Sequence, residues 1–412
     1  MAWKADELAY CTNVHPGESA GDIAANLDRY VGPVKNLAQT ASLSAGLWIS
    51  HEASQSLQAD GQRQRLKQCL VDNQLQLYTL NGFPFGGFHR EVIKEAVYRP
   101  DWSDPKRLDY TVSLATILAD CLPEGRCEGT ISTLPLGFKG DWTPAKHRAA
   151  ITHLMRLVKR LEALEAATGK HILVCLEMEP ACVLEFTPEI ITLFKRDLSA
   201  ASGQHGIDEA TLLRYLGVCF DVCHQAVMFE DAADALMRIY RAGITIGKMQ
   251  LSSALMIRDV DAGSLKAQLR DFAEPSYLHQ TAVRSTDGTI RRFTDLPQAL
   301  SEMPEAMGQE WRIHYHVPVQ LAQINETGLQ TTQFALDDVF AFLAAHPSVR
   351  PHMEVETYTW QVLPEALRPT DDASLVSVID TELQFIRDKL AQYGLLATDY
   401  HVGKTDSAHR SD

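Results

Sequence analysis

Short apolar segments alternate along the chain with longer segments in which apolar residues recur every three or four positions. The short segments favour β-strands, whereas the longer ones favour amphipathic helices, because residues at that spacing lie on one helix face. This alternation is typical of repeated βα units around a parallel sheet. The predicted strands are eight segments, at residues 9–15, 43–49, 75–80, 129–136, 171–176, 216–220, 244–251 and 353–360.

The helical segments fill the connections between these strands. The clearest spans residues 147–168 and stops at Gly169, a residue type that commonly ends helices because it tolerates the left-handed conformation. The predicted helices lie at residues 22–37, 61–71, 111–119, 147–168, 188–200, 208–215, 232–242, 336–345 and 373–393.

The alternation breaks after the seventh predicted strand. Residues 254–320 mix polar residues, glycine and proline, with an Asp287-Gly288 step that favours a hairpin and a further strand at 311–319. Eight βα units predict an α/β protein with a closed TIM (β/α)8 barrel, this insertion between strands seven and eight, and a C-terminal helix. We expect one domain over residues 1–403 and a disordered tail at 404–412.

Composition and charge narrow the class of protein. The 412 residues are 45% hydrophobic and 22% charged, which fits a globular protein with an ample core. A net charge of −15 argues against nucleic acid or an anionic membrane as a partner, since both would be repelled. No apolar signal core or stretch suited to membrane insertion is evident, so we expect a cytoplasmic protein whose partner is a small-molecule metabolite.

The eight cysteines form no C-x-x-C pair, which favours small core residues over disulfides in a reducing compartment. Cys219 and Cys223 flank Asp221 closely. Contact with a metal is conceivable for either of them, but packing is the favoured role because Cys219 lies in an apolar run.

Side chains that can bind a metal follow five of the predicted strands, where a barrel of this kind places its active site. An isolated carboxylate there commonly caps a helix, and Asp221 could do so. Five strand ends with oxygen or imidazole groups instead favour a divalent metal ion: manganese, zinc or magnesium. The side chains are Glu177 and Glu179 after the fifth strand, Asp221 and His224 after the sixth, Gln250 on the seventh, His314 and His316 on the inserted strand, and Glu354 and Glu356 on the last.

Other residues are expected near the same open end of the barrel. Gln250 could hold substrate instead of a metal, and Lys248 on the same strand face could contact a carbonyl or phosphate group. Phe83, Phe85 and Phe88 could form an apolar lid or simply cover the barrel top. Asn13 and the other polar residues near this end of the barrel could contact substrate or could simply be polar loop residues, and the sequence favours neither interpretation. The candidates for substrate contact are His15, Asn81, His89, Glu179, His314 and Glu354.

Three motifs resemble the xylose isomerase-like barrel superfamily, which includes sugar isomerases, ketose epimerases and endonuclease IV. VCFDVCH is similar to a D-x-x-H strand end of the epimerases and endonuclease IV, and LEMEP and EVETY resemble the glutamate-bearing ends of the fifth and last strands. The resemblance implies that Glu177, Asp221 and Glu356 bind metal, with His224 at the site.

The chain departs from the superfamily pattern on the seventh strand, which usually contributes a histidine. Gln250 stands there instead. His316, two residues after His314, could compensate from the insertion, as a D-x-H element does in endonuclease IV.

Longer segments resemble the EboE family, the barrel member of the bacterial ebo cluster. That cluster is associated with metabolite traffic, including export of precursors towards the periplasm. The resemblance implies other ebo-cluster proteins as partners. The segments extend over almost the whole chain and are YCTNVHPGES, LNGFPFGGFH, LEMEP, RIHYHVPV and MEVETYTW.

Three functions fit this site. The first is a metal-dependent isomerase or epimerase of a sugar, sugar phosphate or cyclitol, in which a glutamate removes a proton next to a carbonyl. Glu177 and Glu356 are the ligand and base candidates, and Lys248 is a third catalytic candidate. The alternatives are a metal-dependent hydrolase with an endonuclease IV-like site and a non-catalytic metabolite-binding or carrier protein. The metal-ligand candidates are Glu177, Asp221, His224, Gln250, His316 and Glu356.

Overall fold

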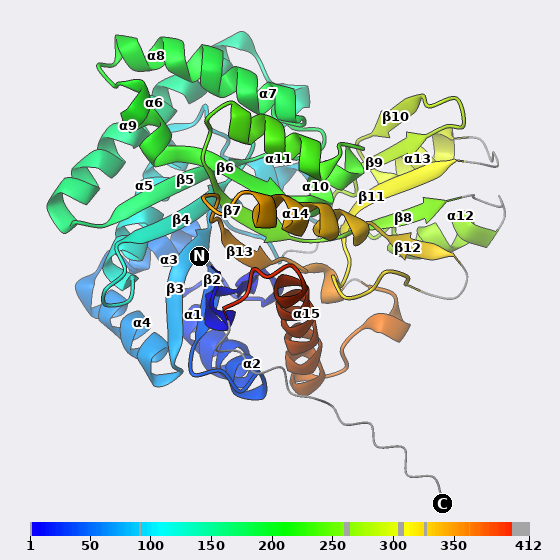
Figure 1. The fold of residues 1–412 in the computed structure, drawn as a ribbon, viewed down its shortest axis with the longest axis horizontal. Helices are drawn as coiled ribbons and strands as arrows, with labels where there is room; N and C mark the ends of the chain where they lie inside the picture. The colour runs from blue at the N-terminus through cyan, green and yellow to red at the C-terminus, as the bar shows by residue number, and fades with distance from the viewer. Residues whose placement is uncertain are drawn as a thin grey trace, which may run out of the picture.

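Eight parallel strands close into a barrel in the order β1-β13-β7-β6-β5-β4-β3-β2 (Figure 1). Each strand overlaps a predicted one, so the predicted TIM (β/α)8 barrel of the α/β class is confirmed. The strands are β1 (Ala9–Cys11), β2 (Leu43–Trp48), β3 (Leu75–Asn81), β4 (Glu128–Thr133), β5 (His171–Glu177), β6 (Leu216–Asp221), β7 (Ile246–Leu251) and β13 (His352–Val355).

The structure is a computed structural model. It describes residues 2–89, 92–258, 264–303, 309–324, 328–361 and 363–397. The tail predicted at 404–412 lies outside these residues. None of the described helices combines the length and apolar character that crossing a membrane requires.

Helices pack around the outside of the barrel (Figure 1). The α6 helix shows why they start and stop where they do: Thr143 accepts a hydrogen bond from the Lys146 N–H at its start, and Gly169 adopts a φ of 70° at its end. The helices are α1 (Ala20–Asn26), α2 (Gly32–Leu37), α3 (His51–Ser56), α4 (Asp60–Asp72), α5 (Pro105–Cys121), α6 (Pro144–Thr168), α7 (Thr187–Thr192), α8 (Ser199–Gln204), α9 (Glu209–Tyr215), α10 (Val222–Val227), α11 (Ala232–Arg241), α14 (Phe334–Ala345) and α15 (Asp372–Gln392).

The insertion between β7 and β13 forms a second sheet, antiparallel and five-stranded, in the order β10-β9-β11-β8-β12. The predicted hairpin is confirmed, because β9 pairs with β10 across a turn in which Gly288 has a φ of 84°. Figure 1 shows the sheet beside α10, projecting from one side of the barrel. Its elements are β8 (Ala254–Arg258), α12 (Ser264–Leu269), β9 (Thr281–Arg284), β10 (Ile290–Phe293), α13 (Leu296–Glu302), β11 (Glu310–His316) and β12 (Leu329–Thr331).

Several predicted strands are too long, the first and the last by the most residues. The first ends at Cys11 and turns into a 3-10 helix at Thr12–Val14, and the last ends at Val355, before a 3-10 helix at Thr359–Gln361. The short helices α3 and α10 were not predicted. The α10 helix begins directly after β6 and α3 begins two residues after β2, with the side chains of Asp221 and Ser50 as their caps.

An ion pair lies inside the barrel, below the mouth. Lys248 on β7 and Glu354 on β13 are fully buried, and Lys248 Nζ is 3.0 Å from Glu354 Oε2. Lys248 Nζ also donates to the Leu80 carbonyl at 3.1 Å. On β2, Gly46 leaves the necessary room, since a Cβ there would lie 2.5 Å from Glu354 Cδ. The pair therefore fills the barrel interior as a structural unit.

Replacing Lys248 by Met should destabilise the protein by about 3–5 kcal/mol, because the carboxylate of Glu354 would remain buried without its partner. The double variant Lys248→Met/Glu354→Leu should recover most of this loss, since it removes both charges. Urea unfolding followed by circular dichroism measures both effects. Equal stability of wild type and the single variant would show that the pair does not matter.

Candidate metal centre

Seven polar side chains meet where the barrel strands end, and all are buried. Glu177 and Asp221 are the last residues of β5 and β6, and Glu356 directly follows β13. The barrel therefore supplies carboxylates, while α10 and the insertion strand β11 supply imidazoles. The seven residues are Glu177, Glu179, Asp221, His224, His314, His316 and Glu356.

The histidines present ring nitrogens to one another. His224 Nε2 lies 3.0 Å from His314 Nε2 and 3.5 Å from His316 Nε2. His224 Nδ1 faces the Met178 carbonyl at 2.9 Å, and His316 Nδ1 faces the Glu356 carbonyl at 2.8 Å. A carbonyl oxygen only accepts hydrogen bonds, so both Nδ1 atoms carry the proton and both Nε2 atoms of the neutral rings keep a lone pair.

Lone pairs this close repel unless a positive charge lies between them. Zinc–nitrogen bonds of about 2.0–2.1 Å place two ligand nitrogens roughly 3.0–3.4 Å apart. The spacing of 3.0 Å between His224 Nε2 and His314 Nε2 lies within this range, and the spacing of 3.5 Å to His316 Nε2 lies just above it. The imidazoles are thus arranged as metal ligands are, each with its other nitrogen fixed by a hydrogen bond.

Asp221 both caps a helix and faces the centre, through different oxygens. Oδ1 accepts from the His224 backbone N–H at 2.8 Å and from the Ser252 hydroxyl at 2.9 Å. Oδ2 is buried and has no hydrogen-bond partner among the described residues. The two interpretations of Asp221 from the sequence are therefore compatible, and Oδ2 is left available to a cation.

The ligand atoms fall into overlapping groups. Oxygens of Glu177, Asp221 and Glu356 lie within 4.8 Å of one another, and so do ligand atoms of Asp221, His224 and His316. A further group joins Glu179 to His224 and His314 at the same spacing. Asp221 therefore links a carboxylate group to the histidines.

Two asparagines orient Glu356. Asn13 Nδ2 donates to Glu356 Oε1 at 2.9 Å, and Asn81 Nδ2 donates to the same oxygen at 3.0 Å. Glu356 Oε2 is not used by either amide and lies 4.0 Å from His316 Nδ1. Asn13 and Asn81 thus act on the centre through Glu356.

Burial and crowding of like charges shift the protonation of this site. Burial raises the pKa of Glu177 and of Glu356 well above the ordinary value, and neighbouring carboxylates, Asp221 among them, raise both further. Burial also raises the pKa of Glu179 to about 8 and lowers the pKa of His224 to about 4. In the absence of a cation, these shifts favour the neutral forms of the groups. A bound divalent ion would compensate the negative charge of ionised carboxylates and so favour their ionised form.

A cavity opens beside these side chains, and six of the seven line it. Of the three phenylalanines expected as a lid, Phe83 and Phe88 line it, whereas Phe85 stacks on His51 with ring centroids 4.3 Å apart. Its aromatic wall consists of Phe83, Phe88, Tyr98, Tyr277 and Tyr358.

Several predicted site residues do not line this cavity. His15 bonds Tyr10 OH at 2.9 Å and stacks on Tyr30. His89 Nε2 bonds the Asn13 carbonyl at 2.8 Å. Gln250 is fully buried in the barrel, and its amide has no partner among the described residues. Lys248 and Glu354 bind each other below the mouth, so direct contact with substrate is not supported for either of them.

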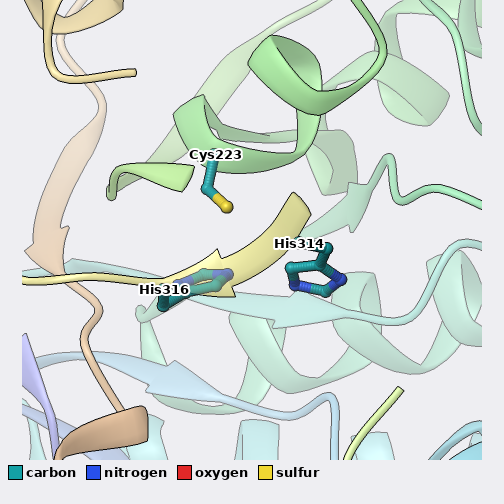
Figure 2. Close-up of side chains that lie close together, drawn as sticks. All are labelled: Cys223, His314 and His316. Carbon is teal, nitrogen blue, oxygen red and sulfur yellow. The ribbon is translucent and has the colours of Figure 1, made fainter. Parts of the chain in front are cut away.

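Three residues at the centre were not assigned to it from the sequence. Cys223 directs its sulfur towards the space between His314 and His316 (Figure 2), and its Sγ lies within 4.8 Å of a ring nitrogen of each. Tyr98 donates to Glu179 Oε1 at 2.7 Å, and Gln280 bonds His314. Tyr98 and Gln280 lie outside the strand pattern, so no spacing in the sequence pointed to them.

Comparison with protein families finds no match for this chain, and comparison with curated proteins finds none either. Solved structures do match over most of the chain. A D-allulose 3-epimerase from Methylomonas sp., in complex with D-allulose, is 12% identical, with 94% of this chain and 98% of that chain covered and a TM-score of 0.49.

Two further matches have similar coverage. A xylose isomerase domain protein from Alicyclobacillus acidocaldarius is 11% identical, with 94% of this chain and 99% of that chain covered and a TM-score of 0.44. The IolI protein with a bound zinc atom is 10% identical, with 94% and 98% covered and a TM-score of 0.43. At these values the barrel assignment rests on the strand pairing of this chain itself.

The metal-free protein should lose stability as the pH rises from about 5 to about 8. Glu179, whose pKa rises from 4.5 to about 8 on folding, stays protonated in the folded state while it ionises in the unfolded state. Glu179 alone should lower the free energy of unfolding by up to about 1 kcal/mol for each pH unit. Glu179→Gln should flatten the decline, and urea unfolding in the presence of EDTA across this range checks it. An unchanged slope would show that Glu179 is already ionised in the folded protein.

Proposed function

We propose that the chain is a divalent-metal-dependent isomerase or epimerase of a small polyhydroxylated metabolite, such as a sugar, sugar phosphate or cyclitol. One observation carries the proposal: carboxylates at the ends of β5, β6 and β13 converge with imidazoles from α10 and β11 beside a cavity. A metal site beside carboxyl groups that can exchange a proton is the arrangement that proton transfer next to a carbonyl requires.

The residues present fit a divalent ion. Asp221 Oδ2 is buried and has no hydrogen-bond partner in the described part of the chain, and the Nε2 lone pairs of His224 and His316 face the same region. A mixed oxygen and nitrogen set suits zinc or manganese better than magnesium, which prefers oxygen alone. Glu177, Asp221, His224, His316 and Glu356 would hold the ion, with His314 Nε2, 3.0 Å from His224 Nε2, as a further ligand. When bound, it would polarise a carbonyl and an adjacent hydroxyl of the substrate.

Glu177 and Glu356 are suited to move a proton at the neighbouring carbon. They come from different strands, and both carboxyl groups line the cavity. Burial and the neighbouring carboxylates raise the pKa of both, which makes each a stronger base than an exposed glutamate. Asn13 and Asn81 keep Glu356 Oε1 in place, and aromatic side chains line the cavity beside it.

Proton exchange tests this function even while the product is unidentified. Metal-loaded protein is incubated in heavy water with a panel of ketoses, their phosphates and oxidised cyclitols, and deuterium next to the carbonyl is measured by mass spectrometry. We expect exchange with at least one compound class and loss of it by 100-fold or more in Glu356→Gln, since general base catalysis contributes about 10²–10⁴-fold. Glu382→Gln, which alters a buried glutamate bonded to Thr357 away from the cavity, is the control. Full exchange by Glu356→Gln would remove Glu356 from the mechanism.

A second candidate is metal-assisted hydrolysis, favoured by the separate ligand group of Glu179, His224 and His314 beside that of Glu177, Asp221 and Glu356. Two groups could hold two ions, and a pair of ions activates water for in-line displacement. Elemental analysis of the purified protein separates the candidates. We expect a single tightly held ion per chain for the isomerase, whereas two or more ions would favour the hydrolase.

The motifs shared with the EboE family support a finer proposal, a role in metabolite traffic together with other proteins of the ebo cluster. YCTNVHPGES and LNGFPFGGFH contain Asn13 and Asn81, the two residues that orient Glu356. These motifs therefore bear on the chemistry of the site as well as on the resemblance.

A further inference from the structure

His314 differs from His224 and His316 in the hydrogen-bond partner of its ring nitrogen Nδ1. The Nδ1 atoms of His224 and His316 face main-chain carbonyls, whereas His314 Nδ1 lies 2.6 Å from Oε1 of the Gln280 side chain. Gln280 directly precedes β9 in the insertion and is 2% exposed. Its backbone carbonyl also accepts from the His314 N–H at 2.8 Å. The two residues are thus joined through both side chain and main chain.

The barrel determines which way round the amide of Gln280 lies. One end of it is 3.1 Å from the carbonyl oxygen of Pro180, which can only accept a hydrogen bond. That end must therefore be the Nε2 donor, and it also lies 2.8 Å from Tyr98 OH. Tyr98 gives its own proton to Glu179 Oε1 at 2.7 Å, so its oxygen is free to accept. A reversed amide would set oxygen against oxygen at Pro180.

The orientation of the amide then dictates the tautomer of His314. Because Oε1 of Gln280 faces Nδ1, that nitrogen must carry the proton, and Nε2 of the neutral ring keeps its lone pair. This Nε2 is the atom 3.0 Å from His224 Nε2. With the opposite tautomer, an N–H would point at the place where the proposed ion would bind.

We propose that Gln280 is a positioning residue of the metal centre. Its amide donates to the Pro180 carbonyl and accepts from His314 Nδ1–H, so the lone pair of His314 Nε2 faces the site proposed for the ion. The insertion thereby contributes two imidazoles and also the group that sets the tautomer of one of them. This inference rests on the proposed function for its metal-binding consequence, whereas the tautomer itself can be observed in the metal-free protein.

Gln280→Met tests the proposal, because methionine keeps the length and bulk of the side chain and removes both ends of the amide. Long-range nitrogen–proton correlation spectra of the histidine rings in metal-free protein report the tautomer of His314. We expect the proton on Nδ1 in wild type and a mixture or Nε2–H in the variant. Competition with a chelator should show zinc affinity reduced by about 10–100-fold, as is usual when a ligand loses its orienting partner.

Two further variants separate positioning from general damage. Gln280→Glu restores an oxygen that can accept from Nδ1–H, and its second oxygen, when protonated, donates to the Pro180 carbonyl as the amide does. At mildly acidic pH, where that proton is retained, we therefore expect the Nδ1 tautomer to return. Gln333→Met removes an amide that donates to the Val319 carbonyl at 2.7 Å and should change neither readout.

A retained Nδ1 tautomer in Gln280→Met would overturn the proposal, as would failure of Gln280→Glu to restore it in a folded protein. If wild type bound no divalent metal, the proposed function would fail, and the tautomer comparison would still decide the role of Gln280.

Discussion

The burial of several carboxylates close together is the constraint on which this structure depends. Glu177, Asp221 and Glu356 are buried and have oxygens within 4.8 Å of one another. Ionised groups cannot be buried at this spacing without compensation, because desolvation and mutual repulsion both oppose it. Either the glutamates are protonated or a cation binds between them. The imidazole lone pairs beside them favour binding of a cation.

The barrel and the insertion contribute different halves of this centre. The parallel strands bring carboxylates to a common edge because their carboxyl ends all meet there. The imidazoles His314 and His316 come from β11, whose pairing with β8 shifts register between Ile313 and His316. Such irregularities bend a strand and redirect its side chains, and they occur often next to active sites. The insertion is thus part of the site and not an appendage to the barrel.

The sequence predicted the fold well because strand periodicity and helix spacing are local properties. It also predicted which strand ends carry metal-capable groups, since residues after apolar strands must lie at the barrel mouth. It could not predict how deep in the barrel each side chain lies. Glu354 and Glu356 were expected on the same strand face, but Glu354 pairs with Lys248 inside the barrel and Glu356 faces the cavity. Gln280 and Tyr98 act through contacts between segments 182 residues apart, which no local pattern records.

The location of an ion is the most direct test of the account. Crystals grown with zinc or manganese, and measured at the absorption edge of the metal, should show an anomalous peak about 2.0–2.3 Å from Nε2 of His224 and from carboxylate oxygens of Asp221 and its neighbours. A peak at another place on the molecule, or none at these side chains at saturating metal, would contradict the central claim that they are the ligands of a divalent cation.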